Sequence, residues 1–465
     1  MAEPSPRPGP RSGAAAAEPS QPQAADRLRD ILLTPGYLKV LVFCAVIGIP
    51  VSLAAFWYLV GLHELEHFLW VDLPHEQGRD MPAWWWPLPL LLVSGLVVGL
   101  VVSRLPGAGG HIPASGLHTG GTLPVTLPGV LLAATASLPF GAVLGPEAPL
   151  IALGGGLALL FRDLARAPAT PQSTALLGAA GAAAAIAVIF GSPLVAAVLL
   201  IEIAGVGGPR LFAVMLPALL SSGVGALVFT GFGRWTGLQT GSLGLKLSAP
   251  PPRLDGPDVL WALLMAVVIA VAMRGVLGAG QRVAASIETT ETTENMENVE
   301  KAVIVRTVLY ALGAGACAAL YALITGRSPA EVASSGRSAI SALASDPHTW
   351  SVGALLAVLA FKGTAYTLCL GSLRGGPIFP ALFLGAAAGV LLAPLPGFGV
   401  IPAMAAGMAA ATAATLRLPV SSVVLVALLL DSADLMPLVI LAAAVAFITA
   451  ELLPSRVADA ETSRV

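Results

Sequence analysis

Long apolar runs separated by short polar stretches make up most of the chain between Tyr37 and Leu453. The first two runs, Tyr37–Gly61 and Pro87–Val102, are close in length to the roughly 20 residues that cross a bilayer. From Leu127 to Gly231 the apolar segments are shorter because Gly, Pro or charged pairs interrupt them, which predicts half-crossing or steeply packed helices. Apolar segments then resume at Val259–Leu277, Ala302–Ile324, Val352–Leu370, Phe379–Leu392, Ile401–Thr415, Val420–Leu430 and Leu435–Leu453.

The composition agrees with a membrane protein. Hydrophobic residues make up 56% of the 465 residues and charged residues only 11%, whereas soluble domains carry about 25% charged residues. The 51 glycines and 38 prolines lie mostly inside apolar segments, as in broken or closely packed membrane helices. The net charge of −2 provides no basic surface for nucleic acid. We therefore predict an all-α, multi-pass integral protein of the cell membrane, surrounded by the lipid bilayer.

Three regions are expected along the chain. Residues 1–35 are rich in Pro, Ala, Ser and Arg and lack the apolar core of a cleavable signal, so we predict a disordered tail. Residues 36–453 are expected to form the transmembrane domain, and residues 454–465 a tail too short for a further domain. The three cysteines lie far apart in sequence within apolar segments, so we expect reduced core thiols.

The two halves of the transmembrane domain resemble each other. Residues Pro149–Gly154 (PLIALG) resemble Pro380–Gly385 (PALFLG), at an offset of 231 residues. Residues Ser192–Leu200 resemble Leu418–Val426, at an offset of 226 residues. We therefore predict two inverted-topology repeats of tilted and half-length helices, whose Gly- and Pro-broken segments meet at a binding site. The expected bounds are about residues 87–231 for the first repeat and 302–453 for the second.

Three Gly- and Pro-rich breaks carry the expected chemistry. They are Gly107–Pro113, Gly145–Pro149 and Gly375–Pro380, and each precedes or starts a helix-like segment. The free N–H groups and the positive dipole end of a helix start bind anions without a full positive charge. Glu147 is expected at such a start, and an acid in so apolar a chain is costly unless it has a task. Glu147 would compete with an anion for these N–H groups, so its protonation would couple anion occupancy to pH.

Together and in this order, the breaks resemble the selectivity-filter motifs of the CLC family of chloride channels and proton-coupled chloride transporters. Gly109–Pro113 (GGHIP) resembles the family's GSGIP, Gly145–Pro149 (GPEAP) resembles GREGP, and Gly376–Pro380 (GPIFP) resembles GIFAP. Glu147 takes the gating-glutamate position, and the resemblance covers roughly residues 37–453. It implies that the anion pathway is lined by Gly109, Gly110, His111, Ile112, Pro113, Gly145, Pro146, Glu147, Ala148, Pro149, Gly376, Pro377, Ile378, Phe379 and Pro380.

The resemblance implies further properties of the whole molecule. It implies a homodimer with one pore per subunit, with chloride or a similar small anion as the substrate. It implies transport rather than enzymatic catalysis, with no metal or organic cofactor. The family's larger members carry C-terminal nucleotide-sensing CBS domains, and we expect none in this chain.

Several positions depart from the family pattern. Gly110 replaces the anion-coordinating serine, leaving only backbone N–H groups, Pro377 has no N–H, and Pro146 replaces an arginine. Ile203 stands where proton-coupled members often carry an inner glutamate, and the pore tyrosine near the C-terminus has no counterpart. We therefore favour passive, channel-like conduction. The alternative is a proton-coupled chloride antiporter, in which water or Glu202 carries the inner proton step.

A separate pattern supports a remote alternative. Residues His63-Glu64-Leu65-Glu66-His67 match HExxH, which on a helix binds zinc through its two histidines and uses Glu64 as a base. Leu254-Asp255-Gly256 resembles the third-ligand segment of intramembrane site-two proteases, and with Asp255 as that ligand the protein would be an intramembrane zinc metalloprotease. This hypothesis explains neither the repeat nor the breaks. The preferred interpretation is an exposed, charged helix end that precedes the interfacial tryptophans Trp84–Trp86.

Four other polar residues have a functional and a plain interpretation. His111 near the pore would tune the response to pH, but a loop histidine is the preferred interpretation. Lys362 and Arg374 would raise the local anion concentration, but snorkelling of their charged ends to the membrane interface is the commoner fate. Glu202 is expected at a helix end or in a packing network slightly more than in a proton relay.

Overall fold

The computed structural model describes residues 34–117, 122–205, 209–237, 244–248, 254–288 and 296–453. Within these ranges all regular elements are helices, and strand-like pairing is limited to an isolated bridge between Gly145 and Gly376. Seven of the described helices are long and apolar enough to cross a membrane. The protein is therefore an all-α, multi-pass integral membrane protein, as its composition predicts. The tails expected at residues 1–35 and 454–465 lie outside the described residues, apart from Thr34 and Pro35.

The N-terminal half begins with one long helix and continues with shorter ones. Proline stands in the first turn of most of these helices, where its missing N–H has no intrahelical partner to lose. The elements are α2 (Pro35–His67), the π-helical η1 (Phe68–Asp72), α3 (Leu73–Glu76), α4 (Pro87–Arg104), the 3₁₀ turns η2 (Pro113–Ser115) and η3 (Pro124–Thr126), α5 (Leu127–Ser137), α6 (Glu147–Leu164), α7 (Pro171–Phe190), α8 (Pro193–Ala204) and α9 (Pro209–Thr236).

The C-terminal half follows the predicted apolar segments closely. The ends of α13 to α17 agree with the predicted segments to within two residues, whereas α10 and α11 extend further at polar ends. The elements are α10 (Gly256–Glu288), α11 (Met296–Thr325), the 3₁₀ turn η5 (Pro329–Glu331), α12 (Arg337–Ser345), the 3₁₀ turn η6 (Pro347–Thr349), α13 (Val352–Ser372), α14 (Ile378–Leu392), α15 (Val400–Leu416), α16 (Pro419–Leu430) and α17 (Met436–Leu452).

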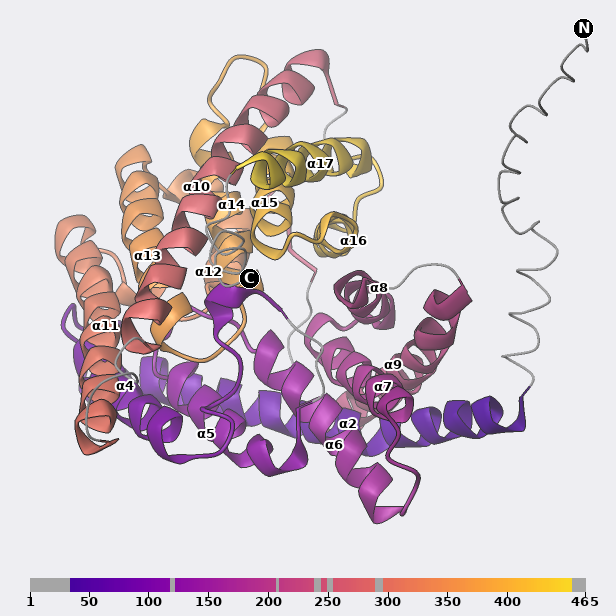
Figure 1. Cartoon of the computed structure of the whole chain (residues 1–465). Helices are drawn as coiled ribbons and strands as arrows, with labels where there is room; N and C mark the ends of the chain where they lie inside the picture. The colour runs from indigo at the N-terminus through magenta and orange to yellow at the C-terminus, as the bar shows by residue number, and fades with distance from the viewer. Residues whose placement is uncertain are drawn as a thin grey trace, which may run out of the picture.

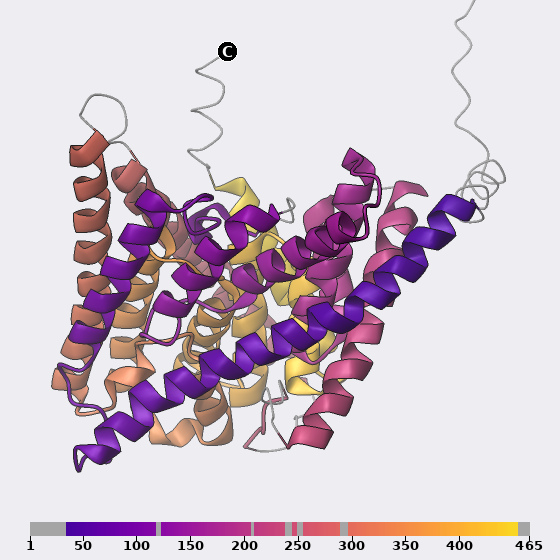
Figure 2. The ribbon, with the colours of Figure 1, turned by 90° about the horizontal axis from the view of Figure 1, so that it is seen from below.

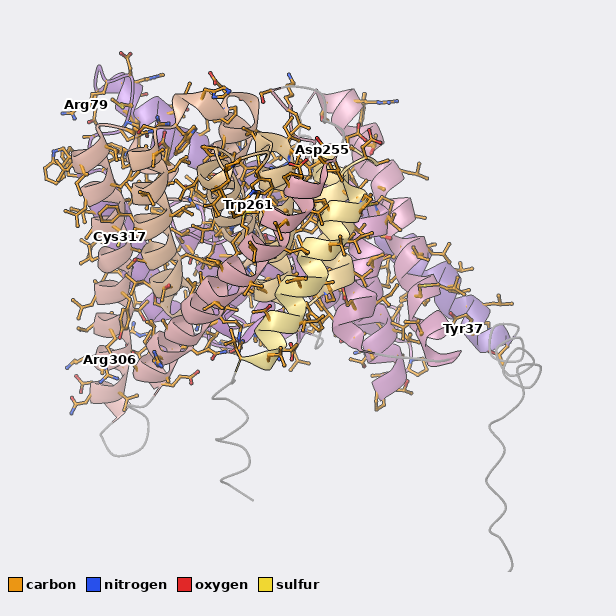
Figure 3. The ribbon with its side chains drawn as sticks, turned by 90° about the horizontal axis from the view of Figure 1, so that it is seen from above. Tyr37, Arg79, Asp255, Trp261, Arg306 and Cys317 are labelled. Carbon is orange, nitrogen blue, oxygen red and sulfur yellow. The ribbon has the colours of Figure 1, made fainter. Side chains whose placement is uncertain are left out.

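The helices differ strongly in tilt. Figure 2 shows α2 crossing one face of the molecule obliquely, while α11 stands more upright at the side. Figure 3 places Arg79 and Asp255 at one end of the helical bundle and Arg306 at the other, so α11 runs through most of its thickness. The outer helices expose large apolar side chains such as Leu227 on α9 and Ile324 on α11, as expected for helices surrounded by lipid.

The two-repeat prediction is confirmed, and the repeat is also visible in the way the helices pack. In the first half α6 meets α7 at Gly154 and Gly181, where a Cβ on either glycine would collide with the other's carbonyl oxygen. In the second half α14 meets α15 at Gly385 and Gly407 in the same way. Small residues allow such close approach of membrane helices. These two glycine pairs are separated by 231 and 226 residues, the two offsets that the sequence repeat shows.

In the N-terminal half, two helices also differ from the prediction. Helix α2 continues to His67 rather than ending at Gly61, because His63, Glu64 and His67 in its last turns are exposed and need no apolar surroundings. Helix α9 is continuous over 28 residues, although its glycines and the internal Pro217 predict an interruption. Neighbouring helices and Ser/Thr side chains can satisfy the backbone groups that an internal proline frees in a membrane helix.

Candidate functional site

The second and third breaks meet inside the molecule. The Gly145 N–H donates to the Gly376 carbonyl oxygen at 2.7 Å, and the Gly376 N–H donates to the Gly145 carbonyl oxygen at 2.5 Å. After each glycine comes a proline and then a helix start, at Glu147 for α6 and at Ile378 for α14. A Cβ on either glycine would collide with the Glu147 carboxylate, so only glycine fits at both positions. The shared Gly-Pro-x-x-Pro pattern thus brings two helix N-termini together.

Glu147 is fully buried between these two helix starts. Its Oε1 accepts a hydrogen bond from the backbone N–H of Phe379 in the first turn of α14, at 3.2 Å. Its Oε2 has no hydrogen-bond partner among the described residues, and no basic side chain there forms an ion pair with it. A buried carboxylate without a cation is costly. The partial positive charge of the two helix N-termini stabilises the Glu147 carboxylate and offsets part of this cost.

Phe379 contacts two further elements around this point. Its ring stacks on that of Phe190 at the end of α7, with ring centroids 6.1 Å apart. The guanidinium of Arg337, at the start of α12, lies 5.7 Å from the centre of the Phe379 ring. Phe379, whose N–H binds the Glu147 carboxylate, is therefore in contact with residues of both repeats.

A cavity of about 280 Å³ lies beside the start of α6. The first break lines it together with the first turn of α6 and the residues that precede the third break. Its lining includes Gly109, Gly110, His111, Ala148, Pro149 and Arg374. The structure thus brings the predicted first and second breaks to one common space, and the bridge between Gly145 and Gly376 places the third break next to it.

The first break starts only a short 3₁₀ turn, so two of the three breaks, the second and the third, begin α-helices. Residues 107–110 all have left-handed backbone angles, with φ between +46° and +96°. The Gly110 N–H donates to the Gly107 carbonyl oxygen at 2.7 Å, so this turn already uses the amide at the family's serine position. Beyond Ile112 the chain makes only a three-residue 3₁₀ turn from Pro113, because Gly116 ends it at φ +89°. So short a turn has no appreciable dipole.

A buried cation, Arg374, lies beside the first break. Arg374 lines the cavity and is 6% exposed. Its guanidinium donates to the Ala108 carbonyl oxygen at 3.2 and 3.3 Å and to that of Leu373 at 3.2 Å. Within the described part of the chain, no carboxylate lies at ion-pair distance from it. Arg374 is therefore a positive charge fixed by carbonyl groups beside the cavity.

The expectation that Lys362 and Arg374 snorkel to the interface is wrong for both residues. Lys362 is fully buried on α13. Its ammonium group lies 3.0–3.3 Å from the four backbone carbonyl oxygens of residues 331–334. Each charge is held by backbone carbonyl groups inside the protein, which sequence alone does not reveal.

The family model described as voltage gated chloride channel matches residues 94–451 of the chain. The chain belongs to this CLC family. A curated relative, YfeO of Salmonella newport (strain SL254), whose name describes an ion-transport protein, is 32% identical over 155 residues. That match spans 33% of this chain and 37% of the relative, so the chain covers little more than a third of the relative's length.

Two solved structures resemble this CLC protein over nearly its whole length. One is a slow cyanobacterial Cl⁻/H⁺ antiporter, with a TM-score of 0.70 and 19% identity over 90% of this chain and 95% of that chain. The other is a CLC-type fluoride/proton antiporter, with a TM-score of 0.66 and 18% identity over 89% of this chain and 96% of that chain. At these identities the likeness establishes the fold.

In this CLC chain Glu202, near the end of α8, caps another helix. Its Oε1 accepts from the Val420 N–H at 3.0 Å, and its Oε2 accepts from the N–H and the hydroxyl of Ser421 at 2.7 and 2.6 Å. Both partners lie in the first turn of α16, where a carboxylate stabilises the positive dipole end. The contact joins α8 and α16, which lie side by side in Figure 1 and occupy equivalent places in the two repeats.

The HExxH segment forms the last turns of α2. His63, Glu64 and His67 are exposed, and His67 Nδ1 bonds Asp72 Oδ2 at 3.3 Å. The backbone N–H of Asp255 donates to Asp258 at the start of α10. Among the described residues, no group of three or more His, Cys, Asp or Glu side chains is arranged to hold a metal ion. The residues of the zinc hypothesis are therefore not assembled into a metal site in this part of the CLC chain.

Sequence reasoning missed one polar residue at the site and misjudged another. The Tyr366 hydroxyl donates to the Pro377 carbonyl oxygen at 2.8 Å, a contact that no periodicity or motif signals. Arg374 directly precedes the Gly375–Gly376 pair, and a charge beside a helix break in so apolar a chain is by itself an indication of function. The sequence signal was available for Arg374, but its burial decides the interpretation.

Proposed function

We propose that this CLC protein moves chloride-type anions across a membrane in exchange for protons, and that Glu147 is the gate. The observation that carries the proposal is the Glu147 carboxylate seated on the N–H of Phe379 at the start of α14. Such N–H groups at a helix start are also what a chloride ion would contact. A deprotonated Glu147 therefore occupies the place of the anion, and a protonated one no longer competes for it.

The proton-coupled form of the proposal is supported by the fold neighbours. Both solved structures reported above are antiporters that exchange an anion for protons. Passive conduction, which the sequence favours, is the second candidate. Its support is that Ile203 replaces the family's inner glutamate and that the neighbouring carboxylate, Glu202, is engaged in capping α16. In the proton-coupled form, water or Glu202 would have to supply the inner proton step.

Purified protein in liposomes distinguishes these mechanisms. With a chloride gradient and a pH-sensitive dye inside, exchange predicts that chloride flow drives protons against their gradient, and that Glu147→Gln abolishes this proton movement. The exposed Glu64 on α2 provides the control, because Glu64→Gln should behave as wild type. Chloride movement without linked protons would favour the passive channel. Absence of anion movement at every pH from 4 to 8 would refute anion transport itself.

We also propose that the protein works as a homodimer with one pore per subunit, as the family resemblance implies. Helices α16 and α17 carry exposed apolar side chains, such as Val420, Ile440 and Ile448, that a second copy would cover. The mass of the detergent-solubilised protein, measured by light scattering with the detergent contribution subtracted, tests this. A mass of one chain at all concentrations would contradict it.

A further inference from the structure

Helix α13 buries three polar side chains on one face. Lys362, Tyr366 and Cys369 are each fully buried, and their spacing of four and then three residues places them on the same side of the helix. Each of them hydrogen-bonds the backbone of a different segment outside the α-helices. Lys362 binds the carbonyls of residues 331–334, Tyr366 donates to the carbonyl of Pro377, and Cys369 Sγ accepts from the Val143 N–H at 3.4 Å.

These three segments are connected to the bridge between Gly145 and Gly376, next to Glu147. Val143 lies two residues before Gly145, in the segment that leads to α6. Segment 331–334 is tied to the same stretch of the first repeat, because the Ser334 N–H donates to the Gly141 carbonyl oxygen at 3.1 Å. Pro377 is the N-cap residue of α14. One helix face therefore holds both sides of the bridge between the two repeats.

Tyr366 is the member of this face that acts on the gate most directly. Its carbonyl partner, Pro377, lies two residues before Phe379, whose N–H binds the Glu147 carboxylate. Because the other carboxylate oxygen of Glu147 has no partner in the described part of the chain, the hold on the gate depends strongly on where α14 begins.

We propose that Tyr366 is a positioning residue for the gate. Its hydroxyl fixes the N-cap carbonyl of α14 and thereby keeps the Phe379 N–H aimed at the Glu147 carboxylate. This inference rests on the proposed function of Glu147. A stiff aromatic ring with one hydrogen bond suits the task, because the buried ring allows little movement of the hydroxyl.

Removing the hydroxyl should weaken the seated state of the gate. In Tyr366→Phe the ring remains and one hydrogen bond is lost, so the carboxylate should hold its place less well against an anion. A typical hydrogen bond corresponds to about a two- to tenfold change in an equilibrium. We therefore expect chloride flux at pH 8, where the carboxylate blocks, to rise about two- to tenfold, while flux at pH 5 stays close to wild type.

The test measures chloride flux from liposomes at equal inner and outer pH between 5 and 8. Tyr310→Phe is the matched control, because its hydroxyl is bonded to Ser286 at 2.8 Å between α10 and α11. A second arm places Tyr366→Phe in a Glu147→Gln background, where no gate is left to loosen and the flux should not change further. A Tyr366→Phe profile that superimposes on wild type, or an equal loss of flux in both backgrounds, would overturn the proposal.

The outcomes separate this inference from the proposed function. If wild-type protein moves no anion, or Glu147→Gln keeps the wild-type pH profile, the proposed function fails. If those two behave as proposed and Tyr366→Phe matches wild type, only the positioning role fails. Should Tyr366→Phe not fold, Tyr366→His keeps an N–H donor with poorer reach, and a raised flux at pH 8 is expected. An unchanged or lowered flux in that folded variant would contradict the proposal.

Discussion

Replacing Arg374 by methionine is expected to lower the affinity of the cavity for chloride while the other residues that line the cavity stay in place. Methionine has a similar length and no charge, so the change removes the fixed positive charge of Arg374 from this wall. Arg374 is 6% exposed, and its guanidinium partners among the described residues are carbonyl groups, so solvent screens its charge little. Its charge is therefore available to an anion in the cavity.

The size of the cavity sets the size of the effect. A sphere of about 280 Å³ has a radius of about 4 Å, so a central anion lies roughly 6 to 8 Å from a guanidinium carbon in the wall. At this separation and an effective dielectric constant of about 20, the attraction is about 2–3 kcal/mol. The dissociation constant for chloride should therefore rise roughly 30- to 100-fold, since about 1.4 kcal/mol corresponds to a factor of ten.

Isothermal titration of purified protein with chloride, at constant ionic strength with gluconate as the replacing anion, measures this constant. Arg374→Lys is the matched control: it keeps the charge but loses the planar donor geometry, and it should stay within about fivefold of wild type. Melting temperature is recorded for both variants, because each also alters the hydrogen bonds to Ala108. A folded Arg374→Met protein that binds chloride within about threefold of wild type would refute the electrostatic argument.

The other predictions concern stability and proton coupling. Lys362→Met leaves four carbonyl groups without their cation and should destabilise the fold by about 3–5 kcal/mol, whereas Lys301→Met, at an exposed ion pair, should change it by less than about 1 kcal/mol. Gly385→Ala forces a Cβ into the carbonyl facing it on α15 and should lower stability by about 1–3 kcal/mol, whereas Gly363→Ala has open space and should be neutral or stabilising. Thermal unfolding in detergent measures the stability of all four of these variants. Equal effects of the two lysine variants, or of the two glycine variants, would contradict the reasoning. Glu202→Gln should lower the melting temperature by weakening the cap of α16, and if it also abolishes proton movement in liposomes, its role extends beyond capping.

The sequence predicts most of the fold because lipid leaves the backbone few choices. A long apolar segment in a membrane has to satisfy its own N–H and C=O groups, so each becomes a helix whose ends follow the change in polarity. This is why the ends of α13 to α17 agree with the apolar segments to within two residues. Helix α9 departs from the prediction because tolerance of the internal Pro217 depends on neighbouring helices, which no local pattern describes.

The site is predictable where the signal is local and unpredictable where it depends on packing. Glu147, between two prolines and after Gly145, is placed correctly at a helix start, because proline and glycine restrict the backbone nearby. The short 3₁₀ turn after the first break has a local cause as well, since Gly116 follows Pro113 too closely to allow an α-helix. The burial of Arg374 depends on a carbonyl 266 residues earlier in the chain, and sequence spacing carries no information about such a contact.

The chemical difference between the two repeats fits the proposed role of Glu147 as the gate. Both repeats present Gly-Pro-x-x-Pro, and both start a helix two residues after the paired glycine. At that position the first repeat carries Glu147 and the second carries Ile378. A second acid there would place two carboxylates side by side without a cation, and at least one would have to stay protonated. With one acid only, the start of α14 is free to act as the donor for whichever anion is present, whether a carboxylate of the protein or an ion from solution.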